Sequence, residues 1–173
     1  NMLNPREPNM YANSDSTLRN LIKQFKITNT DLEFNPDIRD DFVKKHCSNL
    51  SPNTKVLDVA SGNKPYKNFL QHCNYKSHEF HGNSEILDTW RGEKNKKHDH
   101  DIYSPIDAIP VSDNEFDLIL CTEVFEHIPE PIKAMEELVR ICKPGGKILI
   151  TAPFTSGIHQ EPYHFYAGFS PFF

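Results

Sequence analysis

The chain has 173 residues, which is enough for one domain with one sizeable core. Its net charge of −5 at pH 7 disfavours nucleic acid and anionic membrane surfaces as partners. No stretch approaches the roughly 18 consecutive apolar residues of a membrane-spanning helix, and the N-terminus has no apolar signal core. We therefore expect a cytoplasmic protein whose four scattered cysteines stay reduced.

Residues 1–50 predict an N-terminal arm and two helices that belong to the same domain as the rest of the chain. Residues 1–13 are polar and interrupted by proline, which is typical of a loose arm. From Ser14 onward, apolar residues at helical spacing predict a first helix. The segment Asn35-Pro36-Asp37 predicts the start of a second helix, because it combines a cap residue with proline in the first turn. The apolar residues that we expect this helix to turn toward the core are Ile38, Phe42 and Val43.

Strands and helices alternate through the rest of the chain. The pattern predicts strands near residues 55–59, 75–80, 99–103, 116–121 and 147–152, and helices near 66–73 and over 131–142. Residues 82–100 are polar and predict a loop around a short helix or turn. Lys143-Pro144-Gly145-Gly146 is expected to end the last helix and to turn into the last strand. This alternation predicts an α/β fold, with a parallel sheet and helices on both of its faces.

A turn of very small residues follows the first predicted strand. Ala60, Ser61 and Gly62 allow the backbone to turn tightly and to approach a ligand closely. Glu79 lies 21 residues after Asp58, at the end of the second strand, where an acid can accept both hydroxyls of a ribose. An ordinary exposed carboxylate is the alternative reading of Glu79. Pro65 has no N–H to donate to a phosphate, which disfavours the pyrophosphate of a nicotinamide dinucleotide.

Four segments in order resemble motifs of the class I S-adenosylmethionine (SAM)-dependent methyltransferases. They are residues 56–66 (VLDVASGNKPY), 109–117 (IPVSDNEFD), 121–129 (CTEVFEHIP) and 138–150 (LVRICKPGGKILI). The resemblance extends over roughly residues 50–166 and places the SAM-binding core in residues 51–173. It implies a Rossmann-like, doubly wound α/β fold with a mainly parallel sheet of about five strands.

The resemblance implies where the methionine end of SAM would lie. Ala60, Ser61 and Gly62 would wrap it, and Asp58 would orient that turn or the ammonium group of the cofactor. Cys121 and Thr122 would line the cofactor near its sulfonium. Ala60 replaces the first glycine of the family motif, a mild change if its φ is negative. Lys64-Pro65-Tyr66 replaces the end of the glycine run.

At the adenosine end, the resemblance assigns Glu79 to the ribose, Phe80 to the adenine face and the backbone N–H of Ile106 to the adenine ring. Pro105 occupies a position where many members carry an acid for the adenine amino group. Either Asp107 or Asp101 substitutes for that acid, or the contact is absent.

The segment 158–166 (IHQEPYHFY) is rich in ionisable and aromatic side chains and follows the fifth strand. It resembles a stretch in a branch linked to sugar or cell-surface polysaccharide modification. His159, Glu161 and His164 are therefore candidate acceptor-side catalytic residues, with His127 a further candidate; the alternative for each histidine is a structural or surface role. We expect no metal site at residues 98–101 (HDHD), because neighbouring residues on a strand point to opposite faces.

The family fold normally continues with a helix and an antiparallel strand pair, whereas this chain ends 21 residues after Ala152. We expect that strand pair to be lacking, and a homodimer or other partner to cover the edge of the fifth strand. The leading hypothesis is methyl transfer from SAM to a small-molecule or sugar-containing acceptor. The alternatives are a non-catalytic SAM-binding scaffold subunit and, less favoured, an NAD-dependent oxidoreductase.

Overall fold

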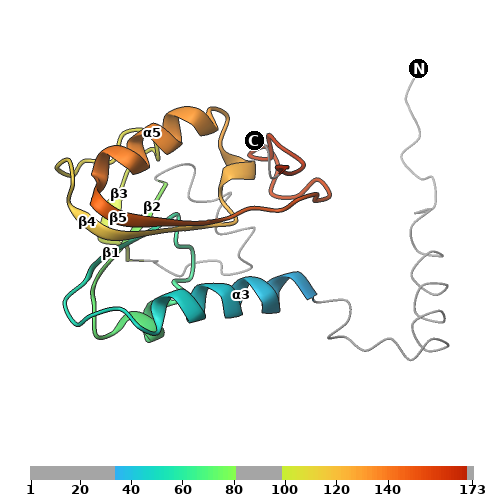
Figure 1. Cartoon of the computed structure of the whole chain (residues 1–173). Coiled ribbons are helices and arrows are strands. Elements are labelled where there is room, and N and C mark those ends of the chain that lie inside the picture. Colours follow the sequence, from blue (N-terminus) through green and yellow to red (C-terminus); the bar gives the residue numbers. More distant parts are fainter. Residues whose placement is uncertain (1–33, 81–98, 171–173) are drawn as a thin grey trace, which may run out of the picture. The chain divides into compact units, whose positions relative to one another are not determined.

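The computed structural model describes residues 34–80 and 99–170 (Figure 1). The chain divides into two compact units, Asn1–Asp41 and Phe42–Phe173, and the second unit contains the whole sheet. The predicted arm, the helix from Ser14 and most of the predicted loop at 82–100 lie outside the described residues.

The described part of the second unit is built on a sheet of five strands in the order β3-β2-β1-β4-β5. The strands are β1 (Lys55–Val59), β2 (Asn74–Glu79), β3 (Ile102–Tyr103), β4 (Phe116–Thr122) and β5 (Cys142–Thr151), and each neighbouring pair is parallel. The predicted α/β class with a parallel sheet is confirmed. The chain adds β2 and β3 on one side of β1 and then β4 and β5 on the other. The strand order therefore reverses between β1 and β4, the place where open α/β sheets bind ligands.

Both faces of the sheet are apolar and covered. Leu57, Val59, Ile119 and Cys121 pack with buried residues of helix α5 (Pro131–Ile141) on one face. On the other face Val56, Leu118 and Leu120 pack with Val43 and Cys47, which lie in the C-terminal part of helix α3 (Phe34–Cys47). Figure 1 shows α5 and the part of α3 from Phe42 onward on opposite sides of the strands. Because successive strand residues point to opposite faces, a strand covered on both sides is apolar almost throughout.

Two predictions about helices need correction. Ile38 and Phe42 of α3 were expected to face the core, but their side chains are 49% and 40% exposed. Val43 and Cys47, four residues apart on one helix face, are fully buried instead. The predicted helix near 66–73 is only the short 3₁₀ helix η1 (Lys67–Leu70), and its one buried residue is Leu70. A second 3₁₀ helix, η2 (Phe125–His127), follows β4.

Strand β5 begins earlier than the sequence indicates. It pairs with β4 from Cys142 onward, and the register jumps from Phe116↔Cys142 to Leu118↔Lys147, so the Lys-Pro-Gly-Gly segment forms a bulge. The glycines are required there: Gly145 has a φ of +79°, and a Cβ on Gly146 would lie 2.8 Å from Cys142 Sγ. The predicted end of the helix is confirmed, because α5 ends at Ile141.

Arg140 of α5 fastens the loop between β3 and β4 to that helix. Its guanidinium donates to the carbonyls of Ile109 and Val111 and to the carboxylate of Glu137, which also accepts the N–H of Ile109 at 2.7 Å. These bonds hold the loop that follows Ile106, and Ile106 lines the cavity described next.

Candidate active site

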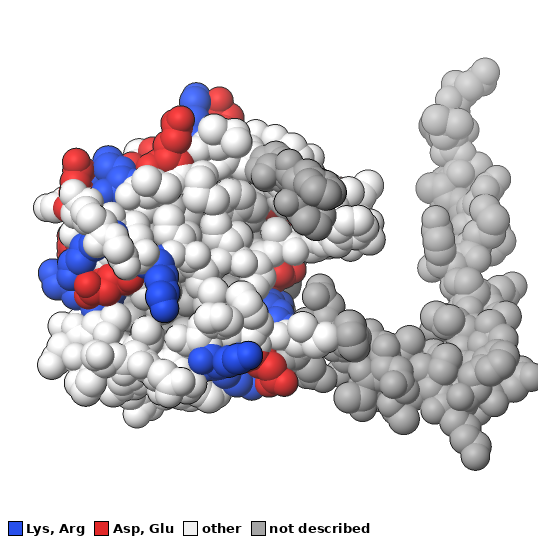
Figure 2. Space-filling model, viewed as in Figure 1, with Lys and Arg blue, Asp and Glu red and all other residues white. Residues whose placement is uncertain are grey.

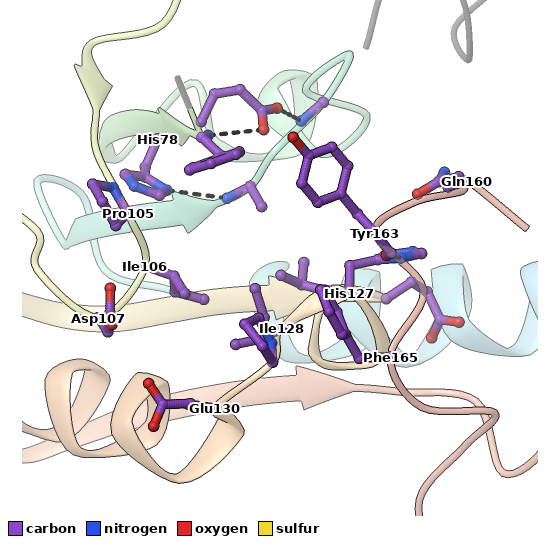
Figure 3. A pocket seen from close by; sticks show the side chains of 17 residues that line it. His78, Pro105, Ile106, Asp107, His127, Ile128, Glu130, Gln160, Tyr163 and Phe165 are labelled. Carbon is purple, nitrogen blue, oxygen red and sulfur yellow. Dashed lines mark hydrogen bonds between the residues drawn. The ribbon is translucent and has the colours of Figure 1, made fainter. Parts of the chain in front are cut away.

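A cavity of about 430 Å³ lies at the carboxyl ends of β1, β2 and β4 (Figure 3). Its walls come from the turn after β1, the end of β2, the loop after β3, the loop after β4 and the segment after β5. Figure 3 shows Tyr163 and Phe165 of that last segment across the cavity from His78 and Ile106. The cavity therefore occupies the switch point of the sheet, and five stretches of sequence enclose it.

Glu79 joins the turn after β1 to the end of β2. Its carboxylate accepts the N–H of Gly62 at 3.1 Å and the N–H of Phe80 at 3.0 Å. Glu79 is 6% exposed and lines the cavity together with Gly62 and Phe80. The backbone thus fixes the orientation of a negatively charged acceptor at the cavity wall.

The turn after β1 adopts left-handed backbone conformations. Gly62 has a φ of +51°, and Ala60 has a φ of +50°. Alanine in place of the family's first glycine would be a mild change only at a negative φ, so Ala60 strains the backbone here. The N–H of Ala60 donates to His78 Nδ1 at 3.3 Å, and the N–H of Ser61 donates to the carbonyl of His78. Ala60 and Gly62 line the cavity, whereas Ser61 is buried behind the turn.

Asp58 lies behind the turn and outside the cavity lining. It is 1% exposed and accepts a hydrogen bond from the hydroxyl of Tyr75 at 2.7 Å. Burial raises the pKa of the Asp58 carboxyl to about 7, although the Tyr75 hydroxyl opposes that rise. The placement suits a residue that supports the turn.

His78 was not identified from the sequence as a site residue, although it directly precedes Glu79. Its Nδ1 accepts from Ala60, so its Nε2 carries the proton and donates to the carbonyl and hydroxyl oxygens of Ser104, at 3.0 and 3.1 Å. Burial lowers the pKa of this histidine and favours the neutral form. A neutral ring therefore bridges the first turn and the loop after β3.

The other residues expected at the adenosine end also line the cavity. Ile106 and Asp107 line the cavity beside Pro105, and Phe80 makes an edge-to-face contact with Tyr163 at 6.1 Å. Asp101 is engaged elsewhere, because its carboxylate accepts from the N–H and hydroxyl of Ser77 at 2.7 Å each. Of the two acids considered for the adenine amino group, Asp107 is the one at the cavity.

The two residues expected near the sulfonium do not line the cavity. Cys121 is fully buried in the core beneath α5, and that burial raises the pKa of its thiol. Thr122 is the last residue of β4, and the lining begins at the next two residues, Glu123 and Val124. Glu123 has a φ of +54°, which marks the sharp turn out of the strand.

The three candidate acceptor-side histidines come together. His127 lines the cavity, and His159 and His164 lie next to it outside the lining, with ring centroids 5.0 and 6.0 Å from that of His127. Glu161 is exposed and does not line the cavity. The segment after β5 instead contributes Gln160, Tyr163 and Phe165, of which the sequence offered no specific sign beyond their aromatic or polar character.

Charged side chains are distributed without a dominant sign on the face seen in Figure 2, where basic and acidic groups are interspersed. None of the helices within residues 34–80 and 99–170 has the length and apolar character needed to cross a bilayer.

The cavity lies at the carboxyl ends of the strands, where open α/β sheets bind their ligands. Residues 57–150 match the family described as a methyltransferase domain, and the chain belongs to that family. The resemblance to class I SAM-dependent methyltransferases is thereby confirmed, and SAM is the cofactor of this family.

Curated relatives agree with this family. A demethylmenaquinone methyltransferase of Anoxybacillus flavithermus is 26% identical over 138 residues, which are 72% of this chain and 56% of the relative. A ubiquinone biosynthesis O-methyltransferase of Thiobacillus denitrificans is 32% identical over 59 residues, 34% of this chain and 25% of the relative. The chain therefore spans between a quarter and just over half of the length of these relatives.

Among solved structures, the YcgJ protein of Bacillus subtilis superposes with a TM-score of 0.53 at 18% identity. The match covers 69% of this chain and 52% of that one. It supports the Rossmann-like fold.

Proposed function

We propose that the cavity binds SAM and that residues 51–173 form a methyltransferase core that transfers the methyl group to a small molecule. The observation that carries this proposal is the Glu79 carboxylate, which the N–H groups of Gly62 and Phe80 hold at the cavity wall. A fixed carboxylate at the end of the second strand can accept both ribose hydroxyls of an adenosine. Membership of the methyltransferase-domain family supports the same ligand.

The rest of the cofactor would extend along the switch point from Glu79. Ala60 and Gly62 would lie along its methionine end, with Asp58 and Ser61 supporting the turn from behind. Phe80 would pack on the adenine, and the backbone of Ile106 and the carboxylate of Asp107 would contact its edge. Cys121 and Thr122 lie at the end of β4, the strand that would point toward the sulfonium. Glu123 and Val124 would form the part of the cavity wall nearest to the sulfonium.

The acceptor would enter opposite the adenosine, between the loop after β4 and the segment after β5. SAM would supply the methyl group: the acceptor atom would form its bond to the methyl carbon as the carbon–sulfur bond breaks, which would leave S-adenosylhomocysteine, and a hydroxyl acceptor would release its proton to solvent. Such a displacement depends mainly on how the two partners are positioned. His127 is at that wall, with His159 and His164 behind it and Glu161 farther out. A sugar-containing acceptor is favoured by the resemblance of residues 158–166, and a small aromatic acceptor by the names of the quinone-pathway relatives.

Two measurements test the proposal. Calorimetric titration with S-adenosylhomocysteine and with NAD should give one saturable site for the first ligand and none for the second. A methyl-transfer assay with labelled SAM should then be run against phenolic and sugar-hydroxyl acceptors. Binding without turnover on any acceptor would favour the scaffold role, and absence of S-adenosylhomocysteine binding would refute the proposal.

A further inference from the structure

Three histidines that are far apart in the sequence form one cluster at the cavity wall. His127 belongs to η2 after β4, whereas His159 and His164 belong to the segment after β5. The ring of His159 lies 5.0 Å from that of His127 and 4.6 Å from that of His164. One ring nitrogen from each histidine lies within 4.8 Å of those of the other two. Three imidazoles this close are a potential set of ligands for one ion.

Backbone carbonyls fix the tautomer of two of these rings. Nδ1 of His127 contacts the carbonyl of Tyr163 at 2.5 Å, and Nδ1 of His159 contacts the carbonyl of Gly157 at 2.8 Å. A carbonyl only accepts, so each Nδ1 carries the proton, and in the neutral ring each Nε2 keeps a free lone pair. A backbone carbonyl on the far nitrogen is the usual second contact of a metal-binding histidine.

The third histidine and a neighbouring acid have polar atoms left without a partner. Within the described residues, His164 Nε2 and Glu126 Oε2 are buried and make no hydrogen bond. Glu126 is 2% exposed, and its other oxygen lies 3.8 Å from Nε2 of His127. Buried polar atoms without partners are uncommon because each costs the desolvation of its group. Their position beside three imidazoles indicates a binding site for an ion or a ligand.

We infer that His127, His159 and His164 bind one divalent first-row transition ion, with Glu126 as the adjacent carboxylate. Imidazole ligands favour ions such as Zn²⁺ and Co²⁺ over Mg²⁺ and Ca²⁺, which prefer oxygen ligands. A tetrahedral Zn²⁺ with bonds of about 2.0–2.1 Å separates its ligand nitrogens by about 3.3 Å. Small rotations of rings whose nitrogens already lie within 4.8 Å would close that set. Binding through His164 Nε2 would move the His164 proton to Nδ1 and give up its long 3.4 Å bond from the His159 N–H.

The bound ion would join the loop after β4 to the segment after β5. That link would add to the backbone bonds that Phe165 and Tyr166 already donate to the carbonyl of Glu126. His127 lines the cavity, so the ion would stiffen the acceptor-side wall. The site does not depend on methyl transfer, and it would persist if the proposed acceptor or cofactor were wrong.

The test uses the untagged, metal-stripped chain titrated with Zn²⁺ by calorimetry and with Co²⁺ by visible absorption. We expect one ion per chain and the strong visible bands of tetrahedral Co²⁺. His159→Gln and His164→Gln should each weaken binding by about 100-fold, because each removes one of three protein ligands. The matched control is His72→Gln, which changes an exposed histidine outside the cluster and should leave binding unchanged.

Further measurements distinguish a loss of metal binding from a loss of folding in the variants. Circular dichroism and thermal unfolding of each variant show whether lost binding reflects lost structure. Hydrogen exchange of the wild-type chain should show slower exchange in residues 153–170 when Zn²⁺ is added. Equal affinity of the cluster variants and the control would mean adventitious binding by surface histidines and would overturn the inference. The absence of tetrahedral Co²⁺ bands in the folded wild-type chain would overturn it as well.

Discussion

Replacing Glu79 by glutamine should weaken cofactor binding sharply. In the proposed complex the Glu79 carboxylate accepts the ribose hydroxyls while both of its oxygens are held by backbone N–H groups, from Gly62 at 3.1 Å and from Phe80 at 3.0 Å. In Glu79→Gln one oxygen becomes an NH₂ group, which cannot accept and which faces one of those N–H donors. The variant therefore loses a charge-assisted bond to the ribose and the fixed orientation of the side chain.

The size of the loss follows from these contacts. A hydrogen bond to a charged group contributes about 1.5–3 kcal/mol. The NH₂ group of the glutamine, which faces a backbone N–H, adds a further fraction of the free energy of a hydrogen bond. We expect a total of about 2–4 kcal/mol, which corresponds to a rise of about 30- to 700-fold in the Kd for S-adenosylhomocysteine. Calorimetric titration of both proteins at one pH and salt concentration measures it.

A matched control separates this local effect from a general one. Glu136→Gln makes the same chemical change at an exposed position of α5 and should leave the Kd unchanged. Thermal unfolding of the ligand-free variants shows whether Glu79→Gln also loosens the turn. A folded Glu79→Gln protein whose Kd rises by less than about threefold, well under one kcal/mol, would refute the assignment of Glu79 to the ribose.

Three further predictions concern stability and assembly. Ala60→Gly should raise the free energy of unfolding by about 0.5–1 kcal/mol, because relief of a left-handed alanine (about 1–2 kcal/mol) exceeds the entropy cost of glycine; a lower urea midpoint would contradict this. The pKa of Asp58 is about 7 in the folded chain and 3.8 in the reference state. Because folding disfavours the ionised carboxylate, Asp58 lowers the free energy of unfolding as the pH rises from about 4 to 7. The stability of the wild type relative to Asp58→Asn should therefore fall over that range, by at most about 4 kcal/mol; a difference independent of pH would refute the buried-carboxyl assignment. Finally, within the described residues β5 pairs only with β4, and we expect a second copy of the chain to cover its free edge; light scattering that shows a monomer at micromolar concentration would count against it.

Much of the fold could be predicted because its signals are local. Buried strands such as β1 and β4 are nearly continuous apolar runs, and α5 places its apolar residues at helical spacing, so their positions were predicted to within a few residues. The bulge at the start of β5 was missed because Pro144 and the glycines that follow are typical of turns. Only the pairing with β4 distinguishes the two.

The sequence by itself determined which segments form strands, the turn at Ala60 to Gly62 and the acid at Glu79, because each depends on short-range spacing. Tertiary structure decided which face of β4 receives Cys121, since both faces are apolar and periodicity does not distinguish them. It also decided that Ala60 is left-handed, that His78 bridges the turn and the next loop, and that His127 meets His159 and His164. Those outcomes depend on how separate loops return to the same end of the sheet, and no local pattern of residues encodes that.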